Sequence, residues 1–245
     1  MGRSNKFNYS LIIPLFNEEY NILKLAHKIK EVNLYKNGMS ELILIDNGSK
    51  DNTKKNIQKL ISTNTWIKGI FLKKNIHYGG AIEKGIKASK NDVVCIIPGY
   101  IQINPSYCND CANVYRKLSN NGYKNIFLNG TRKKRNDSLS QKIVSIIFNL
   151  ITSLILEIPQ YDINGLPKMF SKKLLKNLPK IFNKDFLFNT EIILLAVNSS
   201  YKFIEIEVEL EKRSFGESSW KRTKIKTYFS TLIKLLRIKK RHLND

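Results

Sequence analysis

The chain has 245 residues, of which 42% are hydrophobic, which suffices for one sizeable α/β domain with its own core but not for a second full domain. Its 42 Lys and Arg residues against 20 Asp and Glu residues give a formal net charge of +22, which favours anionic partners: phosphates, nucleic acid or an acidic lipid surface. The three cysteines exclude a disulfide framework, and the three scattered histidines argue against a histidine-based metal site.

Strands and helices are predicted to alternate through the first half of the chain. Apolar residues at helical spacing, such as Ile22, Leu25 and Ile29, separate short segments that are continuously apolar. We expect these segments to form strands over residues 9–13, 41–45, 67–72, 92–97 and 125–128. Repeated βα units of this kind predict an α/β fold with a mostly parallel central sheet flanked by helices on both faces.

The second half of the chain is less regular. We expect an apolar helix over residues 139–158, a helix over 189–197, a half-solvated edge strand over 203–210 and a basic amphipathic tail. The most apolar window, residues 143–158, has polar interruptions and is shorter than the ~20 residues that span a bilayer, and the N-terminus has no apolar signal region. The protein is therefore expected to be cytoplasmic, either soluble or peripheral at the inner face of the membrane.

Two motifs lie where the carboxyl ends of the predicted strands meet, the edge at which α/β proteins bind ligands. Ile12-Ile-Pro-Leu-Phe-Asn-Glu-Glu19 and Asp46-Asn-Gly-Ser-Lys-Asp-Asn-Thr53 resemble the paired nucleotide-binding signature of family 2 glycosyltransferases. Further matches follow in order at Asn75, residues 79–81, residues 130–132, Asp162, Arg213 and residues 216–220.

This resemblance runs from about Tyr9 to about Trp220 and is closest to the dolichyl- and polyprenyl-phosphate sugar (mannose) synthases. It implies a single GT-A-type nucleotide-diphospho-sugar transferase domain over residues 1–220, followed by a basic amphipathic extension over 221–245. It also implies transfer of a sugar from a UDP- or GDP-linked nucleotide sugar to a polyprenyl phosphate at the cytoplasmic face of the membrane.

The predicted nucleotide site combines residues from the two motifs, from residues 98–102 after the predicted fourth strand, and Arg213. Asp46 can accept a hydrogen bond from the base, Gly48 lets the backbone approach the nucleotide closely, and Pro14 is expected to fix the turn out of the first strand. An ordinary turn with a helix cap is the alternative for residues 46–49. The full predicted set is Pro14, Phe16, Asn17, Glu18, Asp46, Asn47, Gly48, Tyr100, Gln102 and Arg213.

The family's metal motif is replaced in this chain. The family ends its fourth strand in Asp-x-Asp followed by Leu-Gln, which hold Mg²⁺ or Mn²⁺; here the run is Pro98-Gly99-Tyr100-Ile101-Gln102. Gln102 is at most one neutral ligand, and hard dications require charged oxygens, which argues against this metal site. Three alternatives stay open: cations such as Arg213 neutralise the diphosphate, the protein binds a ligand without catalysis, or carboxylates from elsewhere supply the ion.

The resemblance also implies an acceptor site. Arg132 matches the family arginine that faces the acceptor phosphate, and Ser145 matches a serine on the next helix. Gln141 stands where the family has a second arginine, with Lys142 beside it. A lipid phosphate is already an anionic nucleophile and requires positioning rather than a base. If the acceptor is a sugar hydroxyl, Asp162 is the best-placed base; its alternative is a loop cap.

Several features allow two interpretations. The helix over 139–158 is either a core helix or an interfacial helix that holds a lipid tail, and the basic tail either lies on an anionic bilayer or packs its apolar face in the core. Cys108 and Cys111 have C-x-x-C spacing in a predicted helix without a second pair, which favours a structural role.

Two other functions compete with sugar transfer. One is a catalytically silent protein that binds a nucleotide sugar or a partner, such as a membrane protein. The other is a nucleic-acid-binding protein, for which no recognition motif is present.

Overall fold

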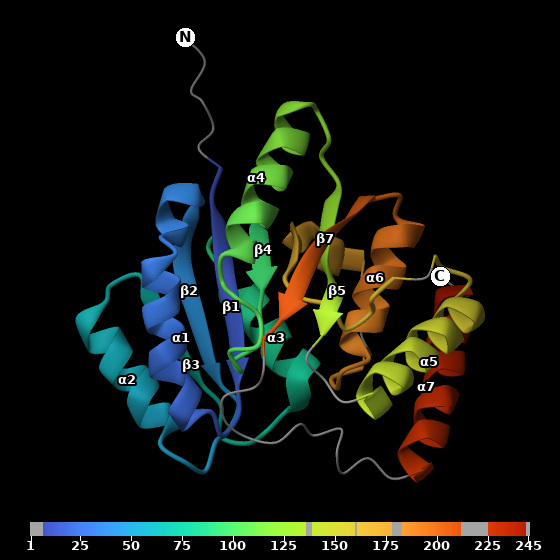
Figure 1. Cartoon of the computed structure of the whole chain (residues 1–245), viewed down its shortest axis with the longest axis horizontal. Helices are drawn as coiled ribbons and strands as arrows, with labels where there is room; N and C mark the ends of the chain where they lie inside the picture. The colour runs from blue at the N-terminus through green and yellow to red at the C-terminus, as the bar shows by residue number, and fades with distance from the viewer. Residues whose placement is uncertain (1–6, 136–138, 160, 178–182, 212–224, 244–245) are drawn as a thin grey trace.

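The computed structural model describes residues 7–135, 139–159, 161–177, 183–211 and 225–243, which surround one central sheet (Figure 1). The sheet has seven strands in the order β3-β2-β1-β4-β6-β5-β7. β6 runs antiparallel to both of its neighbours, and the other strand pairs are parallel. The α/β fold with a mostly parallel sheet is therefore confirmed. The strands are β1 (Tyr9–Leu15), β2 (Met39–Asp46), β3 (Ile67–Phe71), β4 (Val93–Ile96), β5 (Ile126–Arg135), β6 (Lys168–Ser171) and β7 (Lys202–Leu210).

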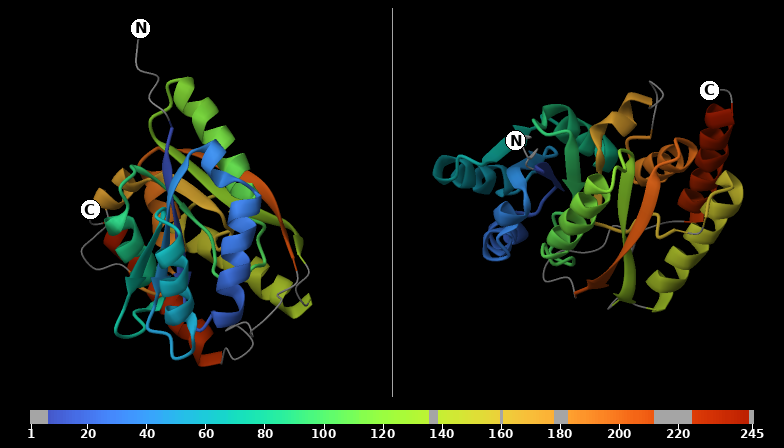
Figure 2. Two further views of the ribbon diagram at one scale, coloured as in Figure 1. Left: turned by 90° about the vertical axis from the view of Figure 1, so that its left-hand side faces the viewer. Right: turned by 90° about the horizontal axis from the view of Figure 1, so that it is seen from above.

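Helices cover both faces of the sheet because the inner strands are apolar on both sides (Figure 2). α1 (Glu19–Glu31), α2 (Thr53–Thr63) and α4 (Tyr107–Asn120) share one core with strand residues such as Leu11 and Leu42. The alternate residues Ile12 and Ile43 face the other core, formed with α3 (His77–Ala88), α5 (Leu139–Leu156), α6 (Phe188–Asn198) and α7 (Ile225–Leu243). Two short 3₁₀ helices, η1 (Leu34–Asn37) and η2 (Lys172–Asn177), complete the described elements.

Two strands differ from the sequence prediction. β6 was not expected, because it is four residues long and begins with a lysine. β5 extends to Arg135, well beyond the predicted end at residue 128, since its polar second half pairs with β7 along nearly its whole length. The predicted edge strand over 203–210 is confirmed, because β7 lies at the end of the sheet.

The role expected of Pro14, to fix the turn out of the first strand, is wrong. The residue lies inside β1 opposite Ile45 rather than in the turn that follows. The chain turns after Leu15, where Asn17 adopts a left-handed backbone with φ of 56°. Pro14 lacks an N–H but is tolerated in the parallel ladder because it stands next to the end of the strand.

The helices α5 and α7, both from the second half of the chain, lie side by side at one end of the sheet (Figure 1). α5 buries Thr152 and Leu156, whereas its other apolar side chains are largely exposed, with Leu139 at 72% and Leu154 at 69%. α5 therefore contributes to the core along one side only, and its role as an interfacial helix stays a prediction. Among the described helices, α5 is the one that is long and apolar enough to cross a membrane, judged by length and composition alone.

α7 packs one face against the domain. Leu235 and Ile238 are buried, and Arg241 pairs with Glu191, which is fully buried. Core packing of the tail is thus confirmed for this face. The predicted boundary at residue 220 lies outside the described residues and stays a prediction.

Candidate functional site

The turn after β2 is locked in place by its own side chains. Asp46 is 2% exposed, and its Oδ1 accepts a hydrogen bond from the Ser49 N–H at 3.0 Å. Asn47 donates to Asn75 Oδ1 at 3.2 Å and accepts from the Ile76 N–H at 3.0 Å. The turn alternative for residues 46–49 therefore describes the local structure correctly, and a nucleotide role for Asp46 stays a prediction.

Gly48 allows a close approach between two backbone segments. Its φ is 74°, and a Cβ there would lie 2.5 Å from the carbonyl carbon of Lys74. Such a contact is far too short for a side chain, so residues 46–49 and 74–77 can meet only through glycine. The sequence predicts that Gly48 lets the backbone approach a nucleotide closely; the close approach in the structure is to the backbone of Lys74.

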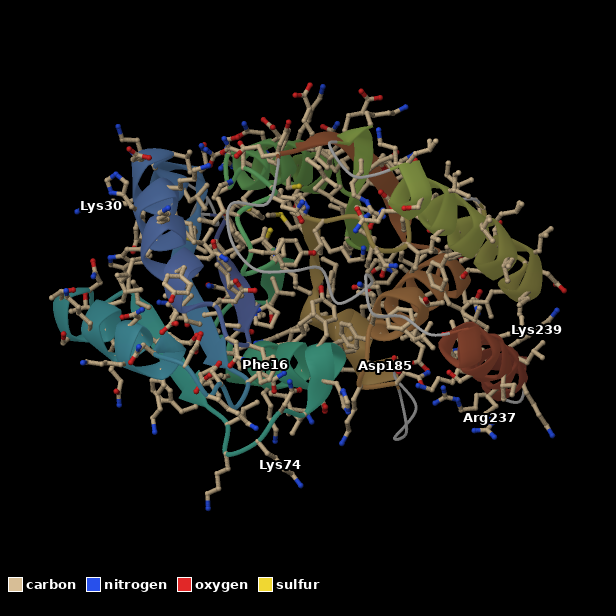
Figure 3. The ribbon with its side chains drawn as sticks, turned by 60° about the horizontal axis from the view of Figure 1, so that its bottom comes forward. Phe16, Lys30, Lys74, Asp185, Arg237 and Lys239 are labelled. Atoms are coloured by element: carbon tan, nitrogen blue, oxygen red, sulfur yellow. The ribbon has the colours of Figure 1, made fainter. Side chains whose placement is uncertain are left out.

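The segment after β1 is tied to the segment after β2. The Asn17 N–H donates to Ser49 Oγ at 3.0 Å, while Asn17 Oδ1 accepts from the Lys50 N–H at 2.9 Å. The Glu18 N–H donates to Thr53 Oγ1 at 2.8 Å. The two motif segments therefore meet at one edge of the sheet, where Phe16 is 42% exposed (Figure 3).

The segment that replaces the metal motif follows β4 at the same edge. A Cβ on Gly99 would lie 2.5 Å from Leu15 Cδ2 and 3.0 Å from the Pro14 oxygen, so the backbone here packs directly against the end of β1. Tyr100 lies near Tyr78, whose pKa is raised by burial and further by Tyr100. The Glu211 N–H donates to the Gln102 carbonyl oxygen at 2.8 Å, and Gln102 Nε2 donates to the Glu211 carbonyl oxygen at 3.3 Å.

These residues do not fit the Mg²⁺ or Mn²⁺ that the family resemblance implies. Residues 98–102 offer no charged oxygen: the Gln102 amide nitrogen donates to the Glu211 carbonyl, and the amide oxygen is a neutral ligand. No group of three or more His, Cys, Asp or Glu side chains suitable for a metal occurs within the described part of the chain. We therefore derive no chemical step that uses a divalent ion.

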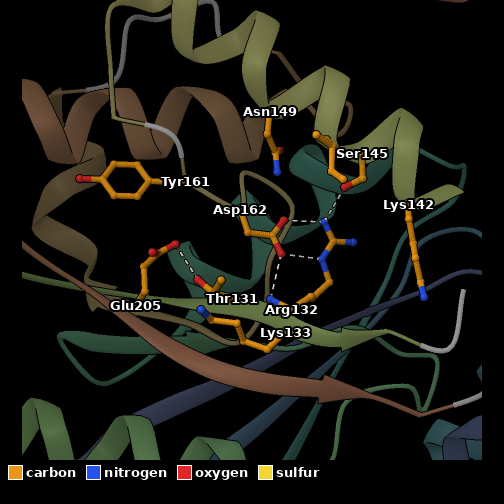
Figure 4. A pocket seen from close by; sticks show the side chains of 10 residues that line it. Thr131, Arg132, Lys133, Lys142, Ser145, Asn149, Tyr161, Asp162 and Glu205 are labelled. Carbon is orange, nitrogen blue, oxygen red and sulfur yellow. Dashed lines mark hydrogen bonds and ion pairs between the residues drawn. The ribbon is translucent and has the colours of Figure 1, made fainter. Parts of the chain in front are cut away.

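A pocket of about 400 Å³ lies further along the sheet, between β5, β7 and α5 (Figure 4). It brings together all the residues predicted for the acceptor side: Arg132, Lys142, Ser145 and Asp162. They come from β5, from α5 and from the loop before β6, and the parallel pairing of β5 with β7 forms one wall. Its other lining residues are Thr131, Lys133, Ile146, Asn149, Tyr161 and Glu205.

Arg132 and Asp162 form a nearly buried ion pair at the base of this pocket. Arg132 Nε and Nη2 donate to the two carboxylate oxygens at 2.7 Å and 2.5 Å, and the Arg132 N–H donates at 3.0 Å. Arg132 Nη2 also donates to Ser145 Oγ at 3.1 Å. Asp162 thus occupies the Nε–Nη2 edge of the guanidinium and fixes the plane of this group in the pocket.

The environment of Asp162 makes its carboxylate a weak base. Burial alone raises the pKa, but the hydrogen bonds and the charge of Arg132 outweigh it and leave the pKa of Asp162 below its usual value. A carboxylate with a lowered pKa and two occupied oxygens accepts a proton poorly at neutral pH. The geometry therefore favours Asp162 as the residue that orients Arg132.

Lys168 and Glu205 were missed by sequence reasoning. Lys168 is fully buried behind the pocket, and burial lowers its pKa to about 7. Glu205 on the edge strand accepts a hydrogen bond from Thr131 Oγ1 at 2.6 Å. Neither stands in a recognisable motif, and a lysine in sequence is ordinarily a surface residue. Arg213 lies outside the described residues, so its predicted place at the diphosphate stays a prediction.

The cysteines form a buried cluster away from both sites. Cys108 and Cys111 are fully buried in α4, and Cys108 Sγ lies 3.8 Å from Cys95 Sγ. Burial raises the pKa values of Cys95 and Cys111 and keeps these thiols protonated. This surrounding suits the structural role favoured by the sequence.

Comparison with proteins of known structure identifies the same fold. Glucosyl-3-phosphoglycerate synthase from Mycobacterium tuberculosis, solved with Mn²⁺, UDP and phosphoglyceric acid, superposes with a TM-score of 0.68 over 94% of this chain and 78% of that one, at 17% identity. At this level of identity the likeness concerns the fold alone.

Curated relatives are similar in sequence over most of the chain. Undecaprenyl-phosphate 4-deoxy-4-formamido-L-arabinose transferase from Shewanella sediminis is 25% identical over 213 residues, which cover 86% of this chain and 61% of the relative. Dodecaprenyl-phosphate galacturonate synthase from Rhizobium johnstonii is 26% identical over 171 residues, 69% of this chain and 49% of the relative. The chain thus matches between half and three fifths of the length of these relatives.

The family model for glycosyl transferase family 2 matches residues 10–178. The matched region contains β1 to β6, the turn after β2, the segment that replaces the metal motif and the Arg132–Asp162 pair. Because this region is well over half of the 245 residues, the chain belongs to glycosyl transferase family 2.

Proposed function

We propose that the protein transfers a sugar from a UDP- or GDP-linked nucleotide sugar to a polyprenyl phosphate at the cytoplasmic face of the membrane. Family membership supports the reaction type, and the names of two relatives supply the acceptor class. The single observation that carries the proposal is the pocket in which Arg132, Lys142 and Ser145 converge beside α5.

The chemistry of this pocket suits a phosphate nucleophile. One phosphate oxygen attacks the anomeric carbon, the bond from that carbon to the nucleoside diphosphate breaks, and the diphosphate leaves with the bonding electrons. Because the attacking oxygen is already anionic, no base is needed, and the weakly basic Asp162 is no obstacle. Arg132, Lys142 and the Ser145 hydroxyl hold the acceptor phosphate in position.

The diphosphate must be stabilised without the family's carboxylate-bound ion. Lysine and arginine side chains, with Arg213 as the residue that matches the family, are the groups for this role. The same replacement of the carboxylates favours a second candidate function, a catalytically silent protein that binds the nucleotide sugar.

A transfer assay separates the two functions. The purified chain is mixed with vesicles that contain undecaprenyl phosphate and with radiolabelled UDP- or GDP-sugars, in EDTA and in Mn²⁺. Label that enters the lipid fraction in EDTA supports the proposal with a metal-independent site. Nucleotide-sugar binding by calorimetry without any transfer supports the silent protein, and the absence of both binding and transfer contradicts both functions.

A further inference from the structure

Lys168 is a charged residue in a place where lysines are rare. Its side chain is fully buried at the start of β6, directly opposite Asn129 on β5. Lys168 Nζ donates to Asn129 Oδ1 at 2.7 Å, to the Ile163 oxygen at 3.0 Å and to the Gly165 oxygen at 2.5 Å. An ammonium has three donors, and each meets an acceptor here.

These bonds fasten the loop that carries Asp162. Two of the three acceptors are carbonyls of the loop itself. The third is Asn129, whose Nδ2 donates to the backbone carbonyl oxygen of Asp162 at 3.0 Å. Lys168 on β6 and its neighbour Asn129 on β5 therefore both hold the loop. The backbone that they hold is that of Asp162, whose side-chain carboxylate binds Arg132.

The backbone of this loop packs closely against β5. A Cβ on Gly130 would lie 2.1 Å from the Leu166 oxygen, and a Cβ on Gly165 would lie 1.7 Å from the Gly130 oxygen. The Gly130 N–H also donates to the Pro167 oxygen at 2.7 Å. Such close backbone packing transmits a displacement at Lys168 directly to Asp162.

Lys168 also acts on the pocket through its charge. The ionisable groups that influence it are Asp162 on the loop, Arg132 on β5 and Glu205 on β7, and all three line the pocket. A positive charge in a buried, low-dielectric position is screened little by water. The ammonium therefore adds to the attraction of the pocket for an anion.

We propose that Lys168 is a positioning residue of the acceptor pocket, whose buried ammonium fixes the Asp162 loop, and hence Arg132, and strengthens the binding of a phosphate anion. The inference rests on the proposed function in one respect, namely that this pocket receives the acceptor phosphate. It adds a residue that does not touch the acceptor and that acts through Asp162 and through its field.

The test compares Lys168→Met with Lys172→Met. Methionine removes the charge and the donors while keeping the length of the side chain. Lys172 is the matched control, since it follows the same strand but donates to the Ser89 oxygen at 3.0 Å, away from the pocket. Calorimetry at pH 7.0 with farnesyl phosphate, with inorganic phosphate and with UDP gives the three affinities, and thermal unfolding verifies that each variant is folded.

We expect Lys168→Met to weaken binding of farnesyl phosphate about tenfold, with UDP binding unchanged, and Lys172→Met to leave both affinities as in the wild type. If Lys168→Met does not fold, Lys168→Gln replaces it, because glutamine keeps a donor and removes the charge. Wild-type affinity in a folded Lys168 variant would overturn the inference.

The pH dependence supplies a measurement that a merely structural role would not change. Above pH 7 a phosphate monoester is almost fully dianionic, so its own ionisation contributes little. Because the pKa of Lys168 is about 7, the wild type should lose affinity for farnesyl phosphate between pH 7 and pH 9, whereas both Lys168 variants should lose less. Equal pH profiles would overturn the charge effect.

The probes separate this inference from the proposed function. If the wild type binds inorganic phosphate in a Lys168-dependent manner but binds no farnesyl phosphate and transfers no sugar, the acceptor assignment fails and the role of Lys168 stands. If the wild type binds neither phosphate, the pocket is not an anion site and the inference is wrong.

Discussion

At the scale of single residues, the Arg132–Asp162 pair lies at the base of the pocket that we propose for the acceptor. Both residues could be predicted from the sequence because they lie in motifs that the family keeps, whereas their mutual ion pair required the fold, since 30 residues separate them. Lys168 had no such signal. What distinguishes it is burial behind the pocket, which depends on the pairing of β5 with β6.

Asp162→Asn tests the orienting role of this carboxylate. The substitution keeps the shape but loses the charged hydrogen bonds to Arg132, each worth about 1.5–3 kcal/mol, so we expect transfer to fall about 10- to 100-fold. The KM for the polyprenyl phosphate should rise, and the affinity for UDP should stay constant. A variant with wild-type kinetics would show that Arg132 needs no partner.

The pH profile distinguishes orientation from base catalysis. Because the folded pKa of Asp162 is lowered, its contribution to stability is present above the pKa of the unfolded chain and is lost as the pH falls through the folded value. The wild-type rate should therefore show no ionisation of Asp162 between pH 5 and pH 8. An acidic limb in this range that disappears in Asp162→Asn would instead identify a base.

Gly48 can be compared with a second glycine that also has a positive φ. Gly122 has φ of 87°, and a Cβ there would meet no described atom within 4 Å, whereas at Gly48 the backbone of Lys74 would be 2.5 Å away. Gly122→Ala should cost about 1–2 kcal/mol for the left-handed conformation alone, and Gly48→Ala should cost about 1–3 kcal/mol more. Chemical denaturation measures both, and equal costs would refute the steric argument.

At the scale of elements, the ion pairs of α7 differ widely in burial. Arg241 Nη2 pairs with Glu191 Oε1 at 2.6 Å, and the Glu191 side chain is fully buried, while Lys239 pairs with the 74% exposed Glu157. The amphipathic pattern predicted the helix but not this anchor. The sequence offers no sign that a glutamate inside the apolar α6 meets an arginine more than 40 residues later.

Arg241→Met should destabilise the protein far more than Lys239→Met. It leaves the buried Glu191 carboxylate without its cation and with the Asn183 N–H as a remaining donor, at a cost of about 3–5 kcal/mol, which corresponds to a fall in Tm of about 10 °C. Lys239→Met should change the Tm little, because exposed pairs contribute little. Thermal unfolding of the two variants tests this difference directly.

The deficit of Arg241→Met should depend on pH with a defined sign. Burial raises the pKa of Glu191, and the Asn183 N–H and the charge and hydrogen bond of Arg241 offset only part of this rise, so the pKa of Glu191 in the variant should be higher still. As the pH falls from 8 to 5, Glu191 takes up a proton and its charge no longer opposes burial, so the difference in stability should shrink. A difference that stays constant with pH would show that packing, and not charge, is lost.

At the scale of the whole molecule, the two predicted binding regions lie at separate places along one sheet. The nucleotide segments follow β1, β2 and β4, and the acceptor pocket lies at β5 and β7 beside α5. The parallel half could be predicted because each strand and helix follows the last in order. In the other half, strands at β5 and β7 could be predicted but their order could not, since β6 enters between β4 and β5 and is too short to show a periodicity.

α5 and α7 stand at the pocket end of the sheet, opposite α1 and α2 (Figures 1 and 2). Their exposed Ile and Leu side chains, together with the net charge of +22, should bind this end to an anionic bilayer. In α5, Ile143→Ser with Leu154→Ser removes two side chains that are 47% and 69% exposed, so stability should change by less than about 1 kcal/mol.

Flotation with vesicles tests this orientation. The double variant should bind anionic vesicles at least about tenfold more weakly, because each apolar side chain contributes about 1.5–3 kcal/mol when buried in lipid. Leu23→Ser on α1, where Leu23 is 41% exposed, is the matched control and should bind as the wild type does. Raising the salt from 0.1 M to 1 M shortens the screening length from about 10 Å to about 3 Å, so the electrostatic part should disappear and leave the contribution of α5. Equal loss in the control and in the double variant would place the membrane on another face and separate the pocket from its lipid acceptor.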